Sequence, residues 1–196
     1  STVSGTDLIV GAKTGSLNLL LYSVFRMSSP TDNISWETYR EIASDKDVAW
    51  AIPISLGDSH KGYRVLGTTE DYFEHFSYGK KRKLELDSGE RFSKTFDVVL
   101  GSEVARSLNY PLGQEMVLAH GVASTSFNTH DSTPFTVVGI LSPTGTPVDQ
   151  TIHVHLRGIE AMHAGWQQGF KLPATGRAQA ESTEEELVPQ SITAFM

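Results

Sequence analysis

The sequence predicts an α+β protein in which a β-rich segment is inserted between two parts of a mixed helix-and-strand region. Residues 1–56 show two candidate helices between two candidate strands, and residues 57–143 change to short strands divided by turns. From residue 144 the mixed character returns, as an insertion in mid-chain would produce. With 196 residues, 39% of them hydrophobic, the chain can bury one sizeable core or two small ones that share an interface.

The first region begins with a short strand and an amphipathic helix. Residues 7–10 are apolar enough for a short buried strand. A helix is expected over residues 17–24, because apolar side chains recur there at the i, i+3, i+4, i+7 spacing of one helical face. These side chains are Leu17, Leu20, Leu21 and Val24.

A second helix and a second strand complete the first region. Ser35 is expected to cap a helix from Trp36 to about Ala43, because its hydroxyl can accept a hydrogen bond from an unpaired amide of the first turn. Residues 48–56 alternate weakly between apolar and polar and predict a strand. Since Pro53 cannot donate a backbone hydrogen bond, we expect that strand at the edge of a sheet.

The inserted region consists mainly of short strands. Strands are expected at residues 63–68, 96–100, 116–119 and 135–141, with helices at 71–76 and 102–108. The second of these helices is expected to end at Asn109, because asparagine tolerates the left-handed conformation that closes a helix and Pro111 cannot continue one.

The last region repeats the order of strand and helix. A strand is expected at residues 152–156 and a helix from about residue 159 to 166. Residues 167–190 are rich in Gln, Glu, Ala, Thr and Pro and predict a mobile loop or linker. Residues 192–196 are apolar again and resemble the beginning of a strand.

Charge and cysteine content exclude several classes of function. Lys and Arg total 16 against 23 Asp and Glu, so the formal net charge of -7 disfavours binding to nucleic acid or to anionic lipid surfaces. The absence of cysteine excludes disulfides, thiolate nucleophiles, iron–sulfur clusters and cysteine-based zinc sites. The longest apolar stretch, residues 17–25, is far shorter than the ~20 residues of a membrane-spanning helix. The chain begins with Ser and shows no signal peptide, so we expect a fragment of a longer protein.

The sequence carries no short motif of an enzyme active site, and we predict no catalytic residues and no cofactor. It contains no G-x-S-x-G elbow, P-loop, H-E-x-x-H or strand-linked G-x-G-x-x-G. Asp71, Glu74 and Asp149 are carboxylates that could act as acids or bases, but no pattern brings two of them together. We interpret them as surface residues.

Three histidines are the best candidates for a metal site. His153 and His155 lie two apart on an expected strand, so both imidazoles point to one face, and His163 on the following helix is a third candidate ligand. No fourth ligand has recognisable spacing, and two half-exposed histidines on an amphipathic strand are the simpler explanation of the pattern. We therefore predict no metal, with a soluble metal-binding or ligand-binding protein that uses His153 and His155 as the alternative function.

Two further features have simple structural interpretations. The basic run from Lys80 to Lys83 could contact lipid headgroups or an acidic partner, but it fits a solvated loop. The three tryptophans are expected to pack in the core, and they are Trp36, Trp50 and Trp166.

Several segments resemble the MacB-like periplasmic core domain of ABC transporter permeases, in the same order and over most of residues 5–166. They are Asp-Leu-Ile-Val-Gly-Ala-Lys at 7–13, Gly-Thr-Thr-Glu-Asp-Tyr-Phe at 67–73, Phe-Asp-Val-Val-Leu-Gly-Ser-Glu-Val-Ala-Arg-Ser-Leu at 96–108, Leu-Gly-Gln-Glu-Met-Val-Leu at 112–118 and Phe-Thr-Val-Val-Gly-Ile-Leu at 135–141. The first of these and Thr-Gly-Thr-Pro-Val-Asp at 144–149 are most similar to a branch related to the lipoprotein-releasing and macrolide-exporting permeases.

The resemblance implies a two-part domain between the first and second of four membrane helices. Residues 1–56 and 144–196 would form a porter-like α/β subdomain that lacks a closing part at its C-terminal end, and residues 57–143 an inserted β-rich, Sabre-like subdomain. The implied location is the periplasmic face of the bacterial inner membrane.

The implied function is mechanical and not enzymatic. A separate cytoplasmic ATP-binding subunit would drive a permease dimer, and this domain would pass the movement outward. A periplasmic adaptor or a lipoprotein cargo stays open as a further partner, and nucleic acid is not expected.

Overall fold

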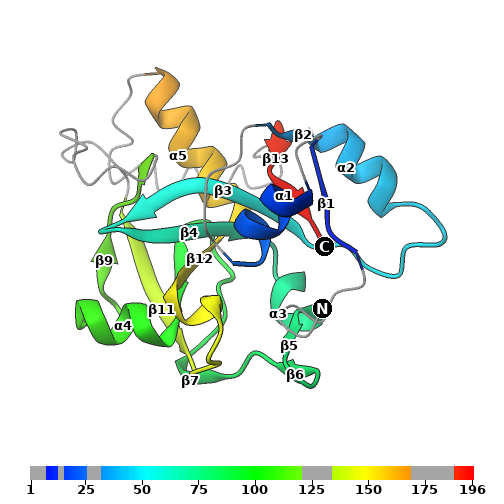
Figure 1. The fold of residues 1–196 in the computed structure, drawn as a ribbon. Helices are drawn as coiled ribbons and strands as arrows, with labels where there is room; N and C mark the ends of the chain where they lie inside the picture. Colours follow the sequence, from blue (N-terminus) through cyan, green and yellow to red (C-terminus); the bar gives the residue numbers. More distant parts are fainter. Residues whose placement is uncertain (1–7, 13–15, 26–31, 121–133, 169–187) are drawn as a thin grey trace.

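The computed structural model describes residues 8–12, 16–25, 32–120, 134–168 and 188–196. Its main feature is one mixed sheet (Figure 1). The strands follow the order β1-β14-β3-β4-β12-β8-β11-β7, with β10 also paired to β3 and β9 to β11. These strands are β1 (Val10–Gly11), β3 (Pro53–His60), β4 (Tyr63–Thr68), β7 (Leu86–Gly89), β8 (Asp97–Leu100), β9 (Glu115–Met116), β10 (Ala119–His120), β11 (Phe135–Leu141), β12 (Thr151–His155) and β14 (Ala194–Phe195).

The other elements are few and short. Two strand pairs stand apart from the main sheet, β2 (Ile34–Ser35) with β13 (Ser191–Ile192) and β5 (Ser77–Tyr78) with β6 (Arg82–Lys83). The helices are α1 (Ser16–Ser23), α2 (Trp36–Ala43), α3 (Asp71–His75), α4 (Ser102–Leu108), α5 (Leu156–Gln168) and a 3₁₀ turn at Pro147–Gln150. This mixture of one sheet with few helices confirms the predicted α+β class. Among the described residues, no helix is both long and apolar enough to cross a membrane.

Strand β12 holds the centre of the sheet. It pairs in parallel with β4 on one side and antiparallel with β8 on the other. Both neighbours come from residues 57–143, whereas β12 follows residue 143, and β3 runs across residue 57. One sheet therefore includes strands from both predicted subdomains, and the subdomain boundaries stay a prediction.

Each face of the sheet carries its own core, because neighbouring residues of a strand point to opposite faces. Ile152 and Val154 of β12 contribute to the cluster that includes Ile159 and Met162 of α5. Val99 of β8 belongs to the opposite cluster, together with other buried side chains that include Tyr72 and Phe73 of α3 and Phe92. Helices α5 and α3 thus cover opposite faces.

A third, smaller core fixes α2 to the end of the chain. Tyr39 of α2 packs with Ile34, Ile192 and Phe195. The predicted cap is confirmed, since the Thr38 amide donates to the Ser35 hydroxyl at 3.1 Å. The apolar end predicted at 192–196 does enter strands, and β14 lies between β1 and β3.

The expectation of an edge strand at Pro53 is wrong, because β3 has partners on both sides. Ile52 exchanges two backbone hydrogen bonds with Met196, and the Ile54 carbonyl accepts from the Thr193 amide. The backbone hydrogen bonds to the end of the chain therefore come from the residues on either side of Pro53, and none of them requires an amide at residue 53. Its backbone faces the side of β4, which ends at Thr68, and the Thr68 hydroxyl donates to the Pro53 carbonyl at 2.8 Å. As the first residue of its strand, proline costs no hydrogen bond of the sheet.

Several predicted boundaries also differ. The strand predicted at 116–119 is two strands with different partners, since β9 pairs with β11 and β10 with β3. The strand predicted at 48–56 begins only at Pro53, and α5 begins at Leu156. The expected linker at 167–190 lies mostly outside the described residues, while Gln167 and Gln168 belong to α5.

Two leucine substitutions test the position of the core. Leu100 of β8 is fully buried, so Leu100→Ala is expected to lower the free energy of unfolding by about 2–5 kcal/mol through lost contacts and a residual cavity. Leu112 is 44% exposed, and the matched Leu112→Ala should cost about 1 kcal/mol or less. Urea denaturation measures both, and equal losses would contradict the assignment of Leu100 to the core.

Candidate functional site

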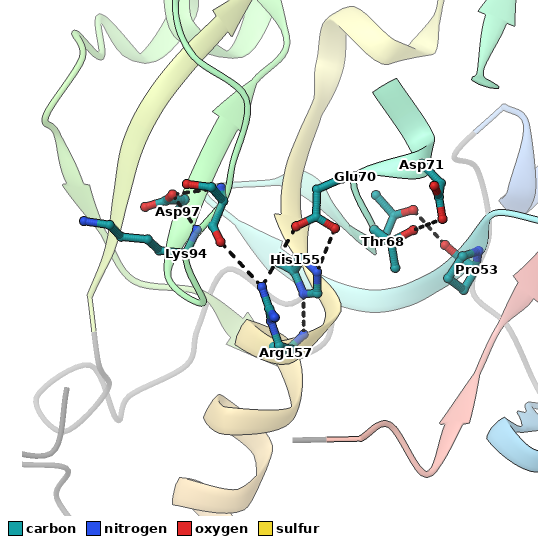
Figure 2. Close-up of polar contacts among 10 residues, drawn as sticks. Pro53, Thr68, Glu70, Asp71, Lys94, Asp97, His155 and Arg157 are labelled. Atoms are coloured by element: carbon teal, nitrogen blue, oxygen red, sulfur yellow. Dashed lines mark hydrogen bonds and ion pairs between the residues drawn. The ribbon is translucent and has the colours of Figure 1, made fainter. Parts of the chain in front are cut away.

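A polar cluster forms where β12, α3 and α5 meet (Figure 2). His155 ends β12, Glu70 precedes α3 and Arg157 lies in the first turn of α5. The His155 Nε2 is 3.2 Å from the Glu70 Oε2, and the Arg157 amide donates to the His155 Nδ1 at 3.0 Å. The Arg157 guanidinium lies 3.9 Å from the other carboxylate oxygen of Glu70.

These contacts define the tautomer of His155. Because Nδ1 accepts a hydrogen bond from an amide, the ring proton is on Nε2, which donates to Glu70. This hydrogen bond is the main reason that the pKa of Glu70 lies below its usual value, and the nearby Arg157 lowers it further. Both ring nitrogens of His155 are engaged, so a metal could bind only by displacing one of these partners.

The same cluster reaches the turn before β8. The Arg157 guanidinium approaches the Ser93 carbonyl at 3.5 Å, and the Asp97 carboxylate accepts from the amides of Ser93 and Lys94 at 3.0 and 2.8 Å (Figure 2). Arg157 therefore links the start of α5 to both the start of α3 and the 93–97 turn. The arrangement connects α5, α3 and the turn before β8.

The three candidate metal ligands do not come together. The fully buried His153 has its Nδ1 3.1 Å from the Val99 carbonyl, and its ring centroid is 5.5 Å from that of Tyr72. His155 lies on the same face of the sheet, near Phe92. His163 belongs to α5, which packs on the opposite face, so the sheet separates it from the other two. Within the described ranges, no three His, Cys, Asp or Glu side chains are grouped to hold a metal ion.

The candidate carboxylates have separate partners. Asp71 accepts from the Thr69 hydroxyl at 3.4 Å, and the exposed Glu74 forms an ion pair with Arg91. Asp149 accepts from the amides of Thr144 and Gly145 and holds the turn before β12. Each of them serves local structure.

The basic run and the tryptophans are placed as follows. Lys80, Lys81 and Arg82 are exposed on the β5–β6 hairpin, whereas Lys83 donates to the carbonyls of Glu74 and His75 at 2.7 and 3.2 Å. Trp36 and Trp50 are partly buried and pack against separate cores. The side chain of Trp166 lies outside the described part of the structure.

Sequence reasoning missed a polar cavity of about 250 Å³ beside the middle of β3. Asp58 of β3, only 6% exposed, has its Oδ2 3.5 Å from the Nε2 of His163, and Glu160 lies one helical turn before His163. The hydrogen bond with Asp58 is the main reason that the pKa of His163 lies above its usual 6.5, and burial raises the pKa of Glu160. Asp58 and His163 are about a hundred positions apart, and the only sequence signal was an acidic residue inside an apolar strand.

The fold is that of an α+β domain built on one main mixed sheet. The chain belongs to the family of MacB-like periplasmic core domains, whose family model matches residues 3–190. The predicted resemblance is thereby confirmed over a longer range than the sequence motifs covered.

Two solved structures are similar to this chain. The periplasmic region of MacB from Actinobacillus actinomycetemcomitans superimposes with a TM-score of 0.51 at 11% identity, covering 95% of this chain and 71% of that one. The extracellular domain of the noncanonic ABC-type transporter YknZ from Gram-positive bacteria gives a TM-score of 0.43 at 11% identity, covering 83% and 89%. A comparison with curated proteins found no match.

The contact between His163 and Asp58 makes a pH-dependent contribution to stability. Because the folded-state pKa of His163 is raised, this contribution is complete below pH 6.5 and is lost as pH rises through the raised value. His163→Gln is therefore expected to lower the free energy of unfolding by on the order of 1 kcal/mol in mildly acid solution and to match the wild type at alkaline pH. Urea titrations of both proteins across this pH range measure the difference.

Asp58→Asn serves as the control for the His163 experiment, since it removes the partner and should abolish the same pH dependence. A difference between wild type and His163→Gln that grows as pH rises would contradict the assignment.

Proposed function

We propose that this chain is the extracytoplasmic domain of an ABC-type permease and passes on movement driven by ATP hydrolysis in a separate cytoplasmic subunit. The family match over residues 3–190 carries the proposal. The fold shared with the periplasmic region of MacB supports it at the level of architecture.

The packing of the sheet supports a mechanical role. Six strands run side by side from β3 through β12 to β7, and α5 and α3 contribute to cores on opposite faces. Because close-packed interiors have low compressibility, such a layer transmits a displacement instead of absorbing it. Arg157, Glu70 and His155 join both helices to the sheet at one end of β12.

The proposal includes the partners of the whole transporter. The ATP-binding subunit would act through membrane helices of the full-length permease, the permease would be a dimer, and an adaptor or a lipoprotein cargo would meet the domain outside the inner membrane. We expect the coding sequence around this segment to specify one hydrophobic span of ~20 residues before it and three after it.

Cysteine labelling tests the location of the domain. The chain contains no cysteine, so a single Lys46→Cys substitution at an exposed position introduces one reactive thiol. In a full-length permease without other cysteines, a membrane-impermeant maleimide is expected to label this thiol in spheroplasts, because the proposed location is outside the inner membrane.

The fully buried Ile54 provides the matched control for labelling. Ile54→Cys should stay unlabelled in spheroplasts and react only after denaturation. Labelling of Lys46→Cys that requires lysis of the inner membrane would place the domain in the cytoplasm and refute the proposal.

An ATPase assay tests the assignment of the energy source. The purified 196-residue chain is expected to release no phosphate from ATP above the buffer blank, whereas the complete permease with its ATP-binding subunit should hydrolyse ATP. Substituting the catalytic residue of that subunit is the control for the complete transporter. Hydrolysis by the isolated chain that persists after further purification would contradict the proposal.

A further inference from the structure

The outer edge of β3 is interrupted in the middle. β14 pairs with β3 at Pro53 and Ile54, and β10 pairs with it at Asp58 and Ser59. Between these positions, the Leu56 amide donates to the Thr193 hydroxyl at 2.9 Å, and that hydroxyl lies 3.3 Å from the Leu56 carbonyl. The Thr193 hydroxyl thus forms the hydrogen bonds of the Leu56 backbone that a neighbouring strand would otherwise form.

The polar cavity lies at this interruption. Gly57 has a φ of +147°, and a Cβ added to it would meet no atom within 4 Å. The strand also changes register between Leu56 and Ser59, so β3 bends away here. The backbone at Gly57 therefore opens onto free space instead of onto a packed neighbour.

The lining of the cavity is polar and comes from four separate parts of the chain. Among the described residues it consists of Asn33, Ser55, Leu56, Gly57, Asp58, Glu160, His163, Gln190, Ser191, Ile192 and Thr193. Its two carboxylates and one imidazole give it a negative character, and its amide and hydroxyl groups add hydrogen-bond acceptors at other points. Asp58 is the most constrained of the charged groups, because it is almost completely buried.

We propose that this cavity binds one organic cation, the alkylguanidinium or alkylammonium group that ends an arginine or lysine side chain or a small free amine. A guanidinium has five donors in a fixed plane, which suit two carboxylates and neighbouring amide and hydroxyl oxygens. The volume of about 250 Å³ is below the ~300–1,000 Å³ of sites for drug-sized ligands and suits a group of a few heavy atoms. This inference is independent of the proposed place of the domain in a permease.

Protonated His163 is expected to compete with the bound cation for Asp58. When protonated, its imidazolium lies beside Asp58 and takes the position of the cation; the charged groups that act on it are Asp58 on β3 and Glu160 on its own helix. A bound cation and this proton compete for the same carboxylate. Affinity should therefore rise with pH through the titration of His163, and His163→Gln should remove that dependence.

Calorimetric titration of the 196-residue chain tests the proposal with three probes. The blocked peptide acetyl-Ala-Arg-Ala-amide carries the cation, the same peptide with citrulline is its neutral isostere, and agmatine is the free alkylguanidine. We expect the arginine peptide or agmatine to bind at least about tenfold more tightly than the citrulline peptide. Binding by the peptide alone indicates a side chain of a partner, and tighter binding of agmatine indicates a free amine.

Substitutions locate the binding. Glu160→Gln and Asp58→Asn should each weaken binding of the cation by about tenfold. The exposed Asn33 lies in the cavity wall, and Asn33→Trp should block the site. Glu41→Gln removes a negative charge from the exposed side of α2 and is the matched control, with no expected change.

Three results would overturn the proposal. They are equal binding of the arginine and citrulline peptides, no binding of either cationic probe at about 10 mM, and binding that survives both Glu160→Gln and Asn33→Trp. Should Asp58→Asn fail to fold by circular dichroism, these two variants decide the question, because both residues are less buried than Asp58.

Discussion

The structure depends on the burial of β12 between two strands that precede it in the chain. All five of its residues are buried, and it pairs in parallel with β4 and antiparallel with β8. Side chains of a strand in this position point into a core on each face of the sheet. They must be apolar or, if polar, must be hydrogen-bonded. Ile152 and Val154 satisfy the first demand, and His153 and His155 satisfy the second through hydrogen bonds.

Polar side chains connect strand β3 to other segments of the chain. The Thr193 hydroxyl takes the place of a strand beside Leu56, and the His60 ring connects the end of β3 to the Val117 carbonyl and the Tyr110 hydroxyl. Burial is the main reason that the pKa of His60 lies below its usual value, whereas the hydrogen bond with the Val117 carbonyl acts in the opposite direction. His60 therefore holds the end of β3 against two neighbouring segments of the chain.

The polar residues around His155 and those around the cavity differ in their surroundings. At His155, Glu70 pairs with both the imidazole and Arg157, and Arg157 also reaches the Ser93 carbonyl. Around Asp58 the wall also includes Asn33, Gln190 and a glycine whose missing side chain leaves space. The first arrangement links three elements of the fold, whereas the second borders the cavity for which we propose a cation as the ligand.

Local sequence determined the elements whose cause is local. The Ser35 cap, the end of α4 at Asn109 in the left-handed conformation, and strands β4 and β11 all follow from neighbouring residues. The family resemblance likewise needed only short motifs in order. Only the tertiary structure decided that β12 lies between β4 and β8, that Pro53 is not at an edge, and that His163 faces Asp58 and not His153. These facts depend on pairings between residues far apart in the chain, which periodicity and spacing do not encode.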